Sequence, residues 1–184
     1  MLYVMSHSFD FMGLSEKLFL LRHLASGARG FCKKEQLIEG PLDYEDDWSL
    51  YYLRMRSLVS SRLIELAANI RIVEDTCKHQ DTYSDIRDLD ALCRDNESIG
   101  VVRQGNFELT LREACNKIIH ATEFDLSISN SRNSRPYYRY SYWSGRCSLK
   151  GAHNNRPWHV ELDVIEWCGA IDCFMDELSR NIDW

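Results

Sequence analysis

Apolar residues recur at alternating steps of four and three positions in two segments of this chain. Such a repeat is typical of helices that pack against one another in a bundle. We therefore predict two long helices, over residues 47–78 and 161–180, that pack together. The first stripe contains Val59, Leu63, Leu66, Ile70, Val73 and Cys77, and the second contains Val164, Cys168, Ile171, Met175, Leu178 and Ile182.

The N-terminal part of the chain has a weaker pattern. Residues 1–13 are expected to be irregular and to lead into a helix that begins near Ser15. Gly27 and Gly30 interrupt the apolar pattern, so the helix is expected to end near Gly27. Residues 35–47 contain six acidic side chains and no basic one, which favours a solvated acidic linker. Further along we expect a helix at 81–94 and a loop at 96–106 with an extended segment at 101–103.

The segment 127–159 changes character, because it contains no Asp or Glu and is rich in tyrosine and arginine. Its alternation of residue types predicts a small hairpin or meander rather than a separate domain. The expected parts are a polar loop at 127–134, strands at 137–143, 146–150 and 158–160, and turns at 144–145 and 151–156.

Between these regions a short polar helix begins at Thr110. Thr110 and Glu113 have the spacing of a capping box, in which each side chain satisfies a free backbone N–H of the other. Arg112, Asn116 and His120 follow one another at intervals of four, so they share one face of the helix. The neighbouring, more apolar face carries Leu111, Cys115, Ile118, Ile119 and Thr122.

A row of Arg, Asn and His can perform phosphodiester chemistry without a metal. His120 could pass a proton at neutral pH, Arg112 could hold a phosphate, and Asn116 could orient either group. The alternative is structural: His120 caps or fills a seam of the bundle while Arg112 and Asn116 are solvated.

The stretch L-R-E-A-C-N-K-I-I-H-A, which contains this row, resembles the signature helix of the HEPN superfamily. These are small helical bundles whose signature is an Arg followed after several residues by a His, usually with a polar residue directly after the Arg. Asn116 and His120 match that pattern. The position directly before Asn116 holds Cys115 instead of Arg, and Arg112 lies one turn earlier. The resemblance covers residues 48–124 and 160–182.

This resemblance implies a mainly α fold, a HEPN-like bundle with a short β-hairpin inserted before the last helix. We expect one domain over residues 1–184. Its expected parts are an N-terminal helix and acidic linker at 14–47, bundle helices at 48–124, a basic and aromatic hairpin at 127–159, and a C-terminal bundle helix at 160–182.

Two functions follow from the resemblance. Family members are often metal-independent RNases of toxin–antitoxin or phage-defence systems, and they dimerise so that two signature helices meet in one cleft. Arg112, Asn116 and His120 would then be the catalytic residues, with RNA as substrate and no cofactor. Other members are non-catalytic, so the alternative is an interaction or dimerisation module with a protein partner such as an antitoxin.

The segment 127–159 interleaves aromatic and basic residues, which suit stacking on unpaired bases and contacts with phosphate. A hairpin whose tyrosines pack on the bundle is the alternative, and binding of a small nucleotide is a third possibility. The candidate RNA-binding residues are Lys117, Arg135, Tyr137, Arg139, Trp143 and Arg146.

Composition narrows the choice of function. The formal net charge is −6, which argues against a protein that binds duplex nucleic acid over its whole surface. Seven cysteines without a C-x-x-C pair favour a reduced, cytoplasmic protein that uses cysteine as a small apolar residue. No membrane span is expected, and Cys147, His153 and His159 do not have the spacing of a zinc module.

Overall fold

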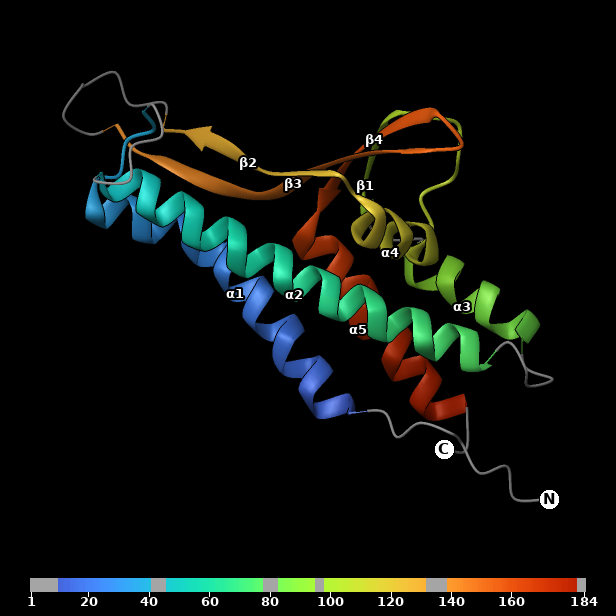
Figure 1. Ribbon diagram of the computed structural model, residues 1–184. Coiled ribbons are helices and arrows are strands. Elements are labelled where there is room, and N and C mark those ends of the chain that lie inside the picture. Colours follow the sequence, from blue (N-terminus) through green and yellow to red (C-terminus); the bar gives the residue numbers. More distant parts are fainter. Residues whose placement is uncertain (1–9, 41–45, 78–82, 95–97, 132–138, 182–184) are drawn as a thin grey trace.

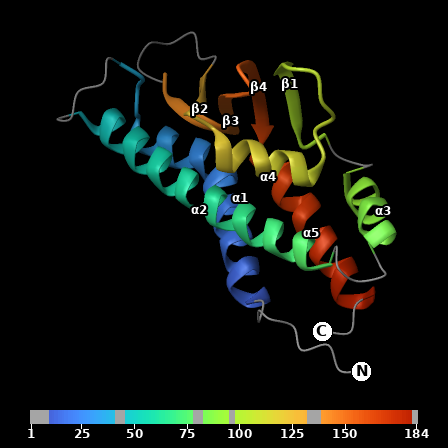
Figure 2. The same cartoon turned by 45° about the vertical axis from the view of Figure 1, so that its right-hand side comes forward.

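The computed structural model describes residues 10–40, 46–77, 83–94, 98–131 and 139–181 (Figure 1). This part of the chain forms five helices and a four-stranded antiparallel sheet. The helices lie on one side of the sheet (Figures 1 and 2). Helices predominate, as predicted, but the β component is a four-stranded sheet rather than a short inserted hairpin.

Helix α1 (Phe11–Glu35) is longer than the sequence predicted. Its first turn donates a hydrogen bond to the side chain of Asp10, and Gln36, in the left-handed conformation with φ 54°, ends it. Gly27 and Gly30 lie inside the helix instead of ending it. A mid-helix glycine costs only about 1 kcal/mol, and burial of one helix face offsets that cost. The buried residues of this face are Leu14, Leu18, Leu21, Ala25, Ala28 and Cys32.

Helices α2 (Asp47–Cys77) and α5 (Val164–Asn181) confirm the two predicted long helices. Every residue of the two apolar stripes is buried except Ile182, which lies outside the described residues. The prediction that these two helices pack mainly on each other is wrong. Helix α2 packs mainly on α4 (Leu111–His120) and α1, whereas α5 packs mainly on α1 and α3 (Tyr83–Arg94). Helix α1 contacts both α2 and α5.

The sheet has the strand order β1–β4–β3–β2. Its strands are β1 (Gly100–Gln104), β2 (Glu123–Asn130), β3 (Ser141–His153) and β4 (Arg156–Asp163). The extended segment predicted at 101–103 is therefore confirmed. Residues 123–130, predicted as the end of a helix and part of a polar loop, are instead a strand that pairs with β3. Leu126 is buried on the inner face of this strand.

The turn predicted at Ser144–Gly145 is wrong, because β3 runs through it without reversing. The register between β2 and β3 shifts at this point, and Gly145 adopts φ 85°. Extra residues on one strand of a ladder form a β-bulge, which glycine accommodates easily. The chain reverses later, at Asn154 and Asn155, whose φ values are 49° and 60°. That turn lies within the predicted 151–156.

One main core joins the sheet to the helices. Trp143 of β3 and Trp167 and Phe174 of α5 are fully buried in it. Six of the seven cysteines are buried, and Cys173 is partly exposed. Within the described ranges, no helix has the length and apolar character that crossing a membrane requires.

Candidate functional site

Helix α4 begins after Thr110 as predicted, but only half of the predicted capping box forms, because the Glu113 carboxylate binds Asn116 and Lys117. The side chain of Thr110 accepts a hydrogen bond from the backbone N–H of Glu113 at 3.0 Å. The helix ends at His120, because Ala121 is already extended. Its apolar face is buried against the core, with Leu111, Ala114, Cys115 and Ile118 at most 4% exposed. The polar row therefore faces α2 and solvent.

Arg112 is bound by two carboxylates of α2. Its Nη1 donates to Oε2 of Glu74 at 2.9 Å, and its Nη2 donates to Oδ1 of Asp75 at 2.7 Å. Because both acids come from the neighbouring helix, this guanidinium links α2 to α4.

Both polar groups of the Asn116 side-chain amide form hydrogen bonds. Its Oδ1 accepts a hydrogen bond from Nη1 of Arg71 on α2, and its Nδ2 donates to Oε2 of Glu113 at 3.1 Å. Arg71 also pairs with Asp75 at 3.3 Å. We call the residues Arg71, Glu74, Asp75, Arg112, Glu113, Asn116 and Lys117 the α2–α4 cluster.

Glu74 is the most buried acid of the cluster, with 4% exposure. Burial raises its pKa to about 7, although the nearby charges of Arg112 and Arg71 oppose the shift. A carboxyl group in this environment gains or loses its proton near neutral pH. Asp90 of α3 adds negative charge nearby and itself accepts hydrogen bonds from Arg94 and from the backbone N–H of Leu111.

Lys117 is buried and enclosed by aromatic rings. Its Nζ lies 4.2 Å from the ring centre of Phe107 and 4.6 Å from that of Trp158. It also pairs with Glu113 at 2.8 Å. The predicted contact of Lys117 with RNA is therefore not available in this conformation, because the ammonium group is already surrounded.

His120 lies apart from Arg112. It is exposed at the last position of α4, eight residues and thus about 12 Å along the helix axis from Arg112. Arg112 and Asn116 are brought together in the cluster, but the histidine does not join them within one chain.

Cys115 is fully buried. Burial raises the pKa of its thiol well above the usual range, and the charge of Glu74 adds to the shift. The position where the resemblance expects arginine is therefore part of the core and not of the polar surface.

The aromatic and basic segment is divided between core and surface. Trp143 has 0% exposure, and its indole N–H donates to the carbonyl of Arg146 at 2.7 Å. No base can stack on it without opening the core, so its predicted role in RNA binding is wrong. Arg139 and Arg146 are exposed, and Arg146 pairs with Asp163 at 3.1 Å. Arg135 and Tyr137 lie outside the described residues.

The partners of the polar row on α2 were not predicted from the sequence. Glu74 and Asp75 lie three and four positions after Arg71 on α2, next to its apolar stripe, and this spacing was a usable signal. Their pairing with α4 depends on how the two helices pack, and the local sequence pattern does not show this packing.

No cluster of three or more potential metal ligands occurs among the described residues. Cys147 faces the core, whereas His159 binds the hydroxyl of Ser148 and His153 contacts Asn154. The three residues considered as zinc ligands thus make separate contacts.

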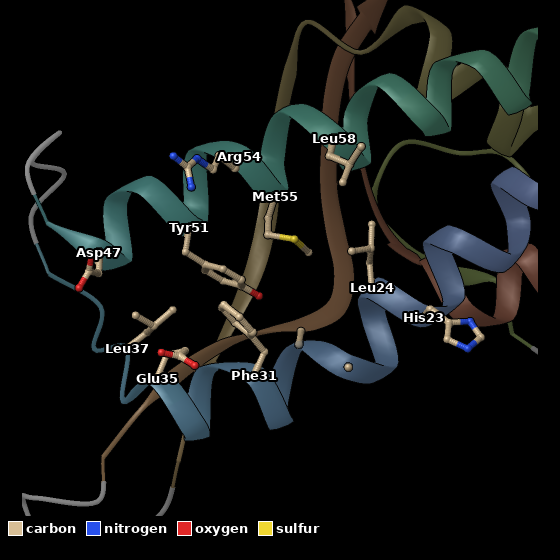
Figure 3. Close-up of a pocket in the computed structure, with 12 residues that line it drawn as sticks. His23, Leu24, Phe31, Glu35, Leu37, Asp47, Tyr51, Arg54, Met55 and Leu58 are labelled. Carbon is tan, nitrogen blue, oxygen red and sulfur yellow. The ribbon is translucent and has the colours of Figure 1, made fainter.

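A second candidate site is a groove between α1 and the N-terminal half of α2, with a volume of about 590 Å³. Figure 3 shows side chains from both helices directed into it. Its size lies within the range of ligand-binding pockets. Sequence patterns did not indicate this groove, because α1 was predicted to end near Gly27.

Comparison of the chain with protein-family models, with curated proteins and with solved structures finds no match.

Proposed function

We propose that this protein is a non-catalytic interaction module, in which the α2–α4 cluster stabilises the fold. The observation that supports this proposal is the pairing of Arg112 with Glu74 and Asp75. An arginine that holds a phosphate needs free positive charge, and two carboxylates at hydrogen-bonding distance remove it.

The charge of the whole cluster supports the same proposal. Three cations, Arg71, Arg112 and Lys117, face three acids, Glu74, Asp75 and Glu113, when all are ionised. A phosphodiester approaching this balanced cluster would meet carboxylates as closely as guanidinium groups. A protein partner, such as an antitoxin or a second copy of the chain, is the kind of molecule that such a module would bind.

A metal-independent RNase of the HEPN type is the competing proposal, and the exposure of His120 favours it. In that proposal, His120 of one protomer would meet Arg112 of a partner protomer. Arg112 would also have to leave Glu74 and Asp75.

RNA cleavage distinguishes the two proposals. Purified protein would be incubated with single-stranded and structured RNAs in EDTA, beside the His120→Ala variant. We expect no cleavage above background from either protein. Cleavage by the wild type that His120→Ala abolishes, with the fold intact by circular dichroism, would overturn the non-catalytic proposal.

A further inference from the structure

The groove between α1 and α2 has an apolar floor. Met55 is buried, Leu24 and Leu58 are half-buried, and all three line it. Figure 3 shows Met55 directed from α2 toward α1, with Leu24 and Leu58 near one end. The two helices run antiparallel beside it, since Glu35 and Asp47 lie at one end and His23 at the other (Figure 3).

One side of the groove carries an exposed aromatic ring. Phe31 is 52% exposed, and its ring stacks on Tyr51 with the centroids 5.7 Å apart. Burial raises the pKa of the Tyr51 phenol, and the neighbouring Cys32 thiol raises it further, so Tyr51 stays neutral. An exposed phenylalanine beside buried apolar residues offers apolar surface that a partner protein can bury.

The end of the groove opposite His23 is acidic. Glu35 and Asp47 line it, and both are exposed. Lys34 approaches Glu35 at 3.8 Å but is itself largely exposed. Glu35 and Asp47 therefore give this end of the apolar groove a negative charge, and the exposed Arg54, which also lines the groove, offsets part of it.

We propose that this groove binds an amphipathic helix of a partner protein, with an apolar ridge on the floor and Lys or Arg side chains at the acidic end. The lining of α1 extends from His23 to Glu35, which is about 18 Å or three helical turns. A helix of that length packs well between two helices, and its i, i+3, i+4 and i+7 side chains would contact Leu24, Met55 and Leu58. This inference rests on the proposed interaction function and names the chemistry of its partner.

Gly27 offers a sharp test of the apolar contact. It lines the groove, and a Cβ atom at this position would meet nothing within 4 Å. Gly27→Leu would therefore add a side chain at the groove with room for its Cβ atom, and leucine favours the helix more than glycine does. Gly30→Leu is the matched control, because Gly30 has equal free space in the same helix and does not line the groove.

The probe is a fluorescein-labelled, 16-residue peptide of Leu, Ala and Lys, with leucines at helical spacing and lysines at one end. Binding would be followed by fluorescence anisotropy. We expect Gly27→Leu to weaken binding by at least about tenfold, because its side chain would occupy space that the peptide needs and displace a central contact, and Gly30→Leu to leave it unchanged. Equal binding by both variants, or equal binding of a scrambled peptide, would overturn the proposal.

The charge at the end of the groove is tested separately. Glu35→Gln with Asp47→Asn should weaken binding severalfold and make it less sensitive to salt. Glu16→Gln with Asp88→Asn removes the same charge from exposed positions outside the groove and should have little effect. A peptide with Glu in place of Lys should bind weakly, and binding as tight as that of the Lys peptide would contradict the proposed partner chemistry.

A second copy of the chain is the other possible occupant. If the wild type is dimeric by sedimentation and Gly27→Leu makes it monomeric, the groove is a self-association surface and the peptide proposal is wrong. RNA cleavage is measured independently, so failure of peptide binding and failure of the non-catalytic proposal are distinguishable.

Discussion

The guanidinium of Arg112 on α4 lies 2.9 Å from the buried carboxylate of Glu74 on α2. This contact joins two helices through residues that are 38 positions apart in the chain. It places the residue proposed as a phosphate ligand in a structural ion pair, and the stability of the fold should depend on it.

Removal of Arg112 should destabilise the protein. Arg112→Ala would leave Glu74 buried beside only Arg71, and breaking a buried ion pair is costly. Because Arg71 remains and Arg112 is partly exposed, we expect a loss of about 2 kcal/mol, or roughly 4–8 °C in melting temperature for a chain of this size. His120→Ala is the control and should leave the melting temperature unchanged, because His120 is exposed. An equal effect of both substitutions would contradict the structural role of Arg112.

Glu74 should make stability depend on pH. Its pKa is raised from 4.5 to about 7 in the folded protein by burial, so between these values the folded state binds more protons than the unfolded state. The free energy of unfolding contributed by this group therefore falls as pH rises from 4.5 through 7. Glu74→Gln should flatten this dependence in urea denaturation at pH 5.5, 6.5 and 8. An unchanged slope would show that Glu74 titrates normally.

Lys117 should contribute to stability more than an exposed lysine does. Lys117→Ala removes a cation enclosed by Phe107 and Trp158 and paired with Glu113. We expect a loss of roughly 1–2 kcal/mol from these contacts. Lys150→Ala is the matched control, since Lys150 is exposed and pairs only at the surface with Glu123. Its effect should be below about 0.5 kcal/mol in chemical denaturation.

Introducing an arginine at position 115, where the resemblance to the HEPN signature would place one, should disrupt the fold. Cys115 is fully buried in the core, and an arginine there would overfill a closely packed site and bury a charge, at a cost of several kcal/mol. We expect Cys115→Arg to give little folded protein, whereas Cys115→Ala should lose only about 1 kcal/mol. Circular dichroism and thermal melting would report both. A stable Cys115→Arg variant would indicate that this position can face the polar side of α4.

The sequence predicted the elements whose signals are local. The stripes of α2 and α5, the Thr110 cap of α4 and the turn near Asn154 were identified correctly, because helix period, capping and turn chemistry depend on residues a few positions apart. The wrong predictions of a helix end near Gly27 and of a turn at Gly145 also came from local signals. A local pattern treats glycine as a break, whereas burial of Ala25 and Ala28 keeps α1 intact and the bulge of β3 accommodates Gly145.

Only the tertiary structure decided which of the candidate site residues are available. The sequence placed Arg112, Asn116 and His120 on one helix face, and this spacing is fixed by the geometry of a helix. It could not show that Glu74 and Asp75 would neutralise Arg112, or that Trp143 would be buried. Those outcomes depend on how distant segments pack, because ion pairing and burial arise between elements that are far apart in the chain. The groove between α1 and α2 likewise depends on how two helices pack, which the sequence pattern of each helix does not show.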